Sequence, residues 1–298
     1  MTFNERSKID SSRVQRRGRG AGSGVAIGGG AGGLVVVLLF LLMQFLGGGN
    51  GSGLDGITNN AQDQTSNQDF AESCQSGADA NANMDCRVAG TINSLDDYWS
   101  DAMPAVGESF KLPGVVIFDT TTSTACGTGS AQMGPFYCPL DETIYLDTGF
   151  FNDLETHYGA SGGPLAQMYV VAHEYGHHIE NTIGVFEVAN RTDTGSDSDS
   201  VKVELMADCL AGVWAGHAAS TKDADGVALI KPLTEQDVKD ALSAAAAVGD
   251  DRIQEQATGR VDESSFTHGS AAQRQDAFTT GYTKGTITAC DAFGLLGR

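Results

Sequence analysis

Basic side chains are scarce in this sequence of 298 residues, which has 18 Lys and Arg against 38 Asp and Glu and a formal net charge of −20. Six of the basic and two of the acidic residues precede residue 47, so the remainder has 12 basic and 36 acidic side chains, a net charge of −24. A strongly acidic surface repels phosphates. Nucleic acid is therefore not an expected partner, and the charge is typical of a soluble exported surface.

The sequence also has no Cys-x-x-Cys pair and no internal repeat. Without that spacing, a zinc site built from cysteines is disfavoured. All six cysteines follow residue 70, which favours disulfides in an oxidising compartment. Fifteen pairings are possible for six cysteines. The local choices are Cys74 with Cys86 and Cys126 with Cys138, each of which closes a loop that contains Gly or Asn. They leave Cys209 with Cys290 as a long-range pair.

The amino end combines a basic segment with an uncharged one. Residues 1–22 have a net charge of +4, and the run from Gly24 to Leu46 has no charged residue. As a helix these residues would reach about 34 Å, enough for a hydrocarbon core of about 30 Å. Residues 47–53 contain no Ala-x-Ala cleavage site, so an uncleaved anchor is favoured over a signal peptide. We expect a basic cytoplasmic tail at 1–22 and a transmembrane anchor at 23–46.

The rest of the chain is predicted to be a linker and one domain. Residues 47–70 are mostly Gly, Asn, Gln, Ser and Asp, which indicates a flexible linker. Residues 71–298 are enough to form one domain with its own core, and we expect this domain outside the cytoplasm. Its Ala-rich composition favours helices. Apolar periodicity predicts an α+β fold that is mostly helical with a small sheet, with strands at 114–118 and 143–146 and helices at 88–104, 164–182, 201–219, 234–248 and 271–284.

The most informative motif is His-Glu-x-x-His at residues 173–177. His173 and His177 are four residues apart, so on a helix both imidazoles project from one face and can bind a single zinc ion. Glu174 lies beside them, where it can act as the general base. The apolar residues that lead into the motif, without Gly or Pro from 165 to 172, predict that a buried helix carries it.

A catalytic zinc ion needs a third protein ligand and an open fourth position. The segment 201–215 is an otherwise apolar helix that contains Glu204 and Asp208, one helical turn apart. One of these carboxylates can bind zinc while the other orients a zinc-bound histidine. We assign Glu204 as the ligand and Asp208 as the orienting residue. An acidic pair on a solvated helix face is the alternative.

Six segments of the sequence resemble the bacterial putative neutral zinc metallopeptidase family in unbroken order over roughly residues 85–295. They are His-Glu-Tyr-Gly-His-His at 173–178, Glu-Leu-Met-Ala-Asp-Cys-Leu-Ala-Gly-Val-Trp-Ala at 204–215, and the segments 134–139, 144–147, 247–254 and 265–274. The resemblance implies a zincin-like fold with His173, His177 and Glu204 as ligands and Glu174 as base. The sequence departs from the family pattern at Met206 and in the acidic, Ser-rich residues 193–200.

The sequence thus predicts a membrane-anchored bacterial zinc peptidase, single-pass, with a cytoplasmic amino end and a peptide or protein substrate. His268 lies in a Gly- and Ser-containing turn before a helix and is our candidate for stabilising the oxyanion of the tetrahedral intermediate. A surface-loop histidine is the alternative for that residue. For the whole protein, the alternative is a non-catalytic binding module that keeps the zincin frame, against which the intact Glu174 argues.

Overall fold

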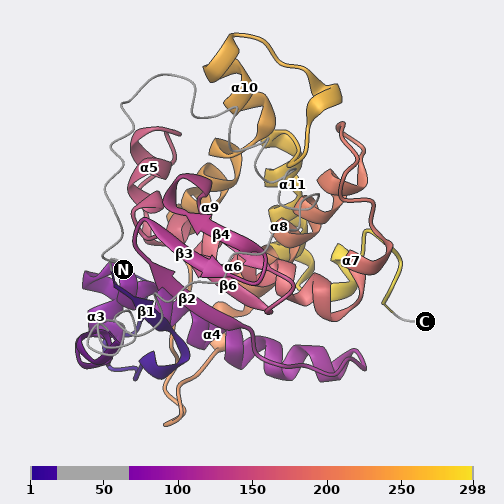
Figure 1. Ribbon diagram of the computed structural model, residues 1–298. Coiled ribbons are helices and arrows are strands. Elements are labelled where there is room, and N and C mark those ends of the chain that lie inside the picture. Colours follow the sequence, from indigo (N-terminus) through magenta and orange to yellow (C-terminus); the bar gives the residue numbers. More distant parts are fainter. Residues whose placement is uncertain (1, 19–66, 297–298) are drawn as a thin grey trace.

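The computed structural model describes residues 2–18 and 67–296, in which helices and strands are largely segregated (Figure 1). The strands are β1 (Gln15–Arg17), β2 (Gly114–Phe118), β3 (Thr121–Thr124), β4 (Gly127–Ser130), β5 (Phe136–Cys138) and β6 (Thr143–Leu146). The helices are α3 (Gly77–Ala82), α4 (Met84–Ala105), α5 (Phe150–Thr156), α6 (Pro164–Thr182), α7 (Val185–Val188), α8 (Asp199–His217), α9 (Glu235–Ala247), α10 (Asp250–Thr258) and α11 (Ala271–Lys284). Residues 67–73 are also helical. The fold is α+β and mostly helical, as predicted.

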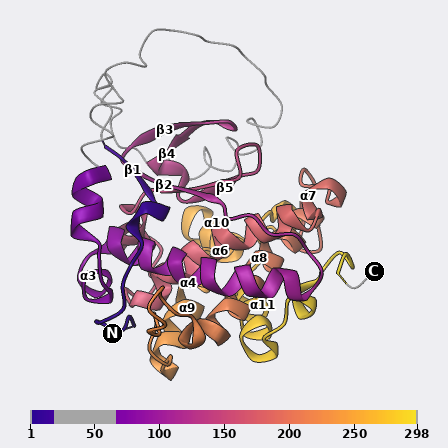
Figure 2. The same ribbon diagram turned by 90° about the horizontal axis from the view of Figure 1, so that it is seen from below.

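The main sheet has four strands in the order β1-β2-β6-β5. β1, β2 and β6 are parallel, and β5 is antiparallel to β6. The strands β3 and β4 form a separate antiparallel pair. Seen from below, the strands form one layer, α4 and α6 cover it, and α9 and α11 lie on the far side of these helices (Figure 2). The strand β5 is thus an edge of the main sheet, and it contacts α6.

The helices α6 and α8 pack closely because Gly176 faces Ala207. A Cβ atom at Gly176 would lie 2.9 Å from both Cα and the carbonyl oxygen of Ala207. The same device recurs between α8 and α11, where a Cβ atom at Gly281 would lie 1.8 Å from the carbonyl oxygen of Cys209. Glycine therefore lets three helix backbones approach each other at the centre of the molecule.

Three disulfides link the described residues: Cys74–Cys86, Cys126–Cys138 and Cys209–Cys290. These are the pairings expected from the sequence. The third bridge spans 81 residues and fixes α8 to the carboxyl-terminal end of the chain.

The amino-terminal residues 2–18 belong to the same folded body as residues 67–296, whereas the sequence predicted a separate tail at 1–22 and a domain that begins at 71. They contribute β1 and the buried side chains of Phe3, Ile9 and Val14. The structural reason is that their partners, α4 and β2, lie about 80 to 100 residues further along the chain, where no local pattern reveals the pairing.

The predicted anchor at 23–46 and most of the linker at 47–70 lie outside the described residues. Residues 67–70 are part of a helix, where a flexible linker was predicted. Phe70 in that helix is buried. Within the residues that the structure describes, no helix has both the length and the hydropathy that crossing a membrane requires.

Candidate metal centre

The helix α6 places the three residues of the His-Glu-x-x-His motif. It begins with Pro164 in its first turn, where a missing backbone N–H costs nothing, and runs to Thr182. His173 and Glu174 are buried, and the rings of His173 and His177 meet edge to face with centroids 4.8 Å apart. The four-residue spacing thus brings both imidazoles to one side of a buried helix, as predicted.

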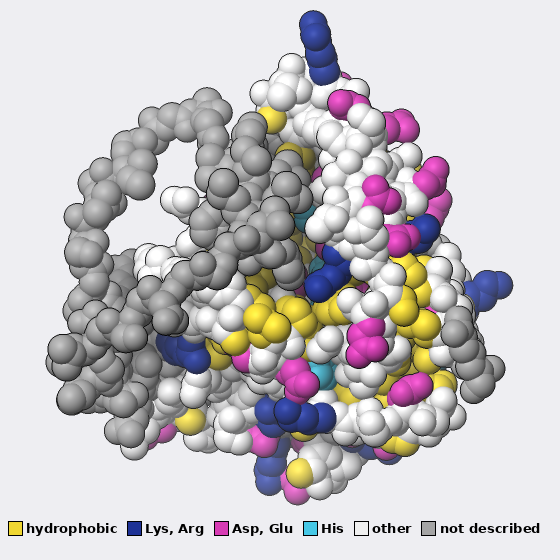
Figure 3. Space-filling model, turned by 45° about the vertical axis from the view of Figure 1, so that its right-hand side comes forward, with side chains coloured by type: hydrophobic (Ala, Val, Ile, Leu, Met, Phe, Trp, Pro, Cys, Tyr) yellow, Lys and Arg dark blue, Asp and Glu magenta, His cyan; other side chains and the backbone are white. Residues whose placement is uncertain are grey.

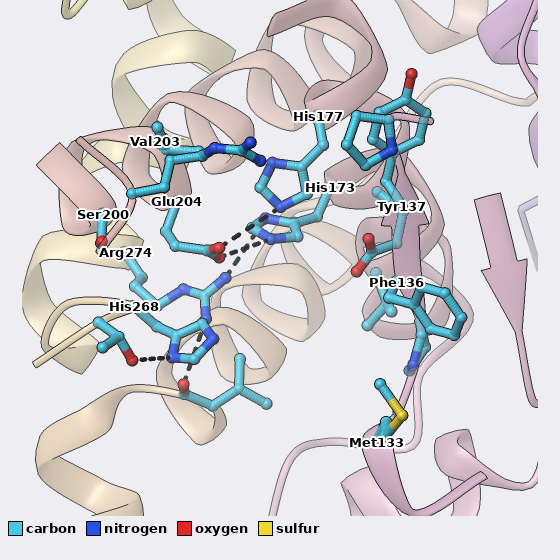
Figure 4. Close-up of a pocket in the computed structure, with 18 of the residues that line it drawn as sticks. Met133, Phe136, Tyr137, His173, His177, Ser200, Val203, Glu204, His268 and Arg274 are labelled. Carbon is cyan, nitrogen blue, oxygen red and sulfur yellow. Dashed lines mark hydrogen bonds and ion pairs between the residues drawn. The ribbon is translucent and has the colours of Figure 1, made fainter. Parts of the chain in front are cut away.

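The helix α8 supplies the third group, Glu204. Its carboxylate oxygens lie 3.1 Å from Nε2 of His173 and 3.6 Å from Nε2 of His177 (Figure 4). One ligand atom from each of the three residues lies within 4.8 Å of the others. Two imidazole nitrogens and one carboxylate oxygen are a donor set that catalytic zinc takes, with room left for a fourth ligand. The residues therefore fit a zinc ion.

Asp208 contacts the ring of His173 at Nδ1, the nitrogen that faces away from Glu204. Its Oδ1 lies 2.8 Å from Nδ1 of His173, and its side chain is completely buried. Arg274 of α11 neutralises this carboxylate through Nε at 2.7 Å from Oδ2, and Tyr169 donates its hydroxyl to Oδ1. A proton kept on Nδ1 leaves the Nε2 lone pair for the metal. The structure thus places Asp208 where the sequence predicted an orienting residue.

Glu180 holds the second ring in the same way, and the sequence analysis did not identify it. Its Oε2 lies 2.8 Å from Nδ1 of His177, and its side chain is completely buried. The other oxygen, Oε1, has no hydrogen-bond partner among the described residues. Burial, together with the nearby Glu204 and Asp208, raises the pKa of Glu180 well above its usual range. The sequence feature that could have identified Glu180 is its position three residues after His177, which places both side chains on the same helix face.

Charge at the site depends on these contacts. Burial alone would raise the pKa of Glu204, but His177, His268 and His173 outweigh it and hold that pKa well below its usual range. For His173, burial opposes the charged form, yet Asp208 and Glu204 prevail and raise its pKa to about 10. Glu204 is therefore ionised, and His173 carries a proton that a metal must displace.

Glu174 lies beside the ligand cluster in the same pocket. Only 7% of it is exposed, and burial raises its pKa above that of an ordinary glutamate, although His177 and His173 oppose the shift. A carboxylate whose pKa moves towards neutrality is a better proton acceptor than one in water. The position and the environment both suit a general base.

His268 lies across the pocket from β5, on the loop before α11, next to Arg274 (Figure 4). Its Nδ1 is 3.3 Å from Oδ1 of Asp250, while Oδ2 of Asp250 accepts the backbone N–H groups of Thr267, His268 and Gly269. This buried carboxylate therefore fixes the whole turn. Burial lowers the pKa of His268, but Glu204 and Asp250 outweigh it and raise the pKa.

The pocket in front of the cluster has a volume of about 370 Å³. On the face seen in Figure 3, hydrophobic side chains gather around a hollow in which histidine is visible. Figure 4 shows Phe136, Tyr137 and Met133 on one side and Glu204 and Val203 on the other. The remaining apolar wall includes Pro135, Pro139, Phe150, Val170, Phe186, Val248 and Ile253. The pocket thus presents one polar cluster within largely apolar walls.

Comparisons with known proteins found one matching family and several similar sequences. The profile of a family described as "Putative neutral zinc metallopeptidase" matches residues 1–293. The uncharacterized protein Rv2575 of Mycobacterium tuberculosis is 50% identical over 221 residues, which are 74% of this chain and 74% of that protein. The uncharacterized protein YpfJ of Escherichia coli K12 is 40% identical over 208 residues, which are 68% of this chain and 69% of that protein. No solved structure matches significantly.

Proposed function

Since the chain belongs to the putative neutral zinc metallopeptidase family, we propose that it hydrolyses peptide bonds with Glu174 as the general base. The observation that carries the proposal is the convergence of His173, His177 and Glu204 on one point beside that buried carboxylate. A purely structural zinc site has four protein ligands and no base beside it. The arrangement therefore supports catalysis rather than a scaffold.

Zinc bound to the three ligands would supply an acidified water molecule and polarise the carbonyl group of the substrate. Glu174 accepts the proton of the attacking water on its carboxylate and then delivers it to the leaving amine. His268, held by Asp250, offers Nε2 to the oxyanion of the tetrahedral intermediate. Asp208 and Glu180 keep the two histidine rings in place throughout.

The walls of the pocket indicate how a peptide lies. The strand β5 is an edge of the sheet, and its residues Phe136 and Tyr137 line the pocket. An extended peptide can pair with such an edge through main-chain hydrogen bonds. The apolar residues around the cluster would then receive apolar side chains of the substrate. The proposed substrate is accordingly an extended peptide or protein segment with apolar residues near the scissile bond.

The proposed location is outside the cytoplasm. The three disulfides support it, because disulfides persist in oxidising compartments. Attachment to the membrane through residues 23–46 rests on the length and hydropathy of that segment.

The test is digestion of an unbiased peptide library by the zinc-loaded full chain. We expect cleavage that stops when a chelator removes the metal and returns when zinc is restored. A chain that binds peptides without cleaving any, at full zinc occupancy, would instead be a binding module.

A further inference from the structure

We infer that residues 2–18 are a permanent part of the peptidase domain, so that this segment and the zinc site lie on the same side of any membrane. The inference concerns the arrangement of the chain and does not depend on peptide hydrolysis. It replaces the expectation from the sequence that residues 1–22 face the cytoplasm while residues 71–298 lie outside it.

The first support is the burial of the amino-terminal segment. Phe3 is completely buried, and its ring packs so closely on α4 that a Cβ atom at Gly90 would lie 2.7 Å from it. Backbone hydrogen bonds join the segment to distant parts of the chain, from Asn4 N to Leu229 O and from Gly77 N to Ser7 O, each at 2.9 Å. Contacts of this kind are typical of a domain core rather than of a tail.

The second support is that basic side chains of the segment, among them Arg13 and Arg16, have acidic partners in the domain. Arg13 donates Nε to Asp96 at 2.6 Å and Nη2 to the carbonyl oxygen of Pro113 at 3.1 Å. Arg16 lies between two further carboxylates, those of Asp85 at 2.9 Å and Asp119 at 2.8 Å. Three of the six basic side chains that indicated a cytoplasmic tail, those of Lys8, Arg13 and Arg16, thus form ion pairs within the fold. Basic side chains that are paired within a folded domain are a weaker guide to orientation than those of a free tail beside a membrane span.

The third support is a direct connection to the zinc-binding helix. The carboxylate of Asp96 that receives Arg13 also accepts the hydroxyl of Tyr175 at 2.9 Å. Tyr175 lies between Glu174 and Gly176 in the motif itself. Without residues 2–18, the side chain of Asp96, which is 12% exposed, would lose its only cationic partner among the described residues. Leaving a buried carboxylate unpaired is strongly unfavourable.

The fourth support is the position of the two ends of the undescribed segment. The backbone N–H of Arg16 donates to Oδ1 of Asn67 at 2.5 Å, so the chain leaves and re-enters the domain at one place. A segment whose ends meet crosses a membrane an even number of times or not at all. Two helical crossings need about 40 apolar residues, and the uncharged run Gly24–Leu46 has 23. The two described parts of the chain, residues 2–18 and 67–296, therefore lie on the same side of any membrane.

The first test labels single cysteines in the full chain in bacterial cells, which is straightforward because all six native cysteines are in disulfides. Arg6→Cys and Lys239→Cys place thiols at exposed positions in the amino-terminal segment and on α9. A membrane-impermeant maleimide should label both in intact cells, and both should label in detergent. One thiol labelled and the other protected until the cells are permeabilised would overturn the inference. Protection of both until permeabilisation would keep it but remove the proposed extracytoplasmic location.

The second test measures the packing itself. Nζ of Lys8 lies 2.7 Å from Oδ2 of Asp225, and both side chains are exposed. A carbodiimide should join them by an amide bond with loss of one water, which mass spectrometry detects as a linked peptide in the monomer. The internal control is Lys111 with Glu142, also at 2.7 Å and exposed. Lys8→Arg should abolish only the first product. A membrane sample that yields the control product without the Lys8 product would overturn the inference.

Discussion

Nδ1 of His177 and Oε2 of Glu180 are 2.8 Å apart on the same helix, where the carboxylate is completely buried. His173 has an equivalent partner in Asp208, which comes from the facing helix α8. Each of the two histidines of the site therefore has its ring fixed by a carboxylate, one from its own helix and one from the neighbouring helix. A ring held in this way presents Nε2 to the metal without a search among rotamers.

The partner of His177 can be tested by Glu180→Gln. The amide keeps the size of the side chain but replaces the carboxyl group that holds Nδ1 of His177, so zinc affinity should fall by about 10- to 100-fold. Competition with a chromophoric chelator measures this loss. Glu187→Gln, at an exposed position on α7, is the matched control and should leave the affinity unchanged. Equal affinities for both variants would assign Glu180 a purely structural role.

Glu174→Gln separates catalysis from metal binding. The substitution preserves volume and helix propensity, so folding and zinc content should persist. Hydrolysis should fall by a factor of at least about one hundred, because the proton acceptor is lost. The measurement is peptide cleavage at matched zinc content. Comparable rates in wild type and variant would exclude Glu174 as the base.

The roles of the two carboxylates on α8 differ, and their substitutions should differ accordingly. Glu204→Ala removes a ligand and should abolish stoichiometric zinc binding, whereas Asp208→Ala should weaken it to a smaller extent. Elemental analysis after dialysis distinguishes these results. Full occupancy in Glu204→Ala would show that another residue is the third ligand.

Zinc binding should depend on pH through His173. In the metal-free protein its pKa is raised to about 10, so the ring is protonated at pH 8, and a metal must displace that proton. Below pH 10 the apparent zinc affinity should therefore decrease as the pH falls. In Asp208→Asn the main cause of the raised pKa is lost, and about one proton fewer should be released per zinc at pH 8. Calorimetry in two buffers of different ionisation enthalpy measures the difference, and equal release would contradict the assignment.

His268 should contribute to the rate and not to metal binding. His268→Ala removes a donor near the reacting carbonyl, and losses for such donors are typically about 100- to 1,000-fold in kcat. Zinc content should be unchanged. His157→Ala, at an exposed position, provides the control. A variant at position 268 that turns over peptide at the wild-type rate would transfer the role to another residue.

The sequence predicted those parts of the fold that are determined by residues close together in the chain. The apolar residues before His173 and the apolar character of residues 201–215 identified α6 and α8, and the spacing of four residues identified the facing imidazoles. Loop closure was enough to pair Cys74 with Cys86, because the bridge spans only 12 residues.

Features that depend on contacts between residues far apart in the sequence were not predicted. The strand β1 is three residues long and reads Gln-Arg-Arg, with no apolar alternation to reveal it. Its position depends on pairing with β2 and on ion pairs with residues 69 and 103 positions away. Arg274 is similar, since only the folded chain brings it to Asp208, 66 residues earlier in the sequence. The helix α10 was not predicted either, because it has no apolar periodicity: Asp250 is its only buried residue.

The close approach of α6 to α8 at Gly176 constrains which residues can occupy the motif. The proposed zinc chemistry requires three of its five residues, His173, Glu174 and His177. The other two are fixed by neighbours: Gly176 by the backbone of Ala207 and Tyr175 by the carboxylate that Arg13 neutralises. In this chain the two variable positions of the signature are therefore constrained, and His-Glu-Tyr-Gly-His reflects a helix crossing and the packing of the amino-terminal segment as well as a metal site.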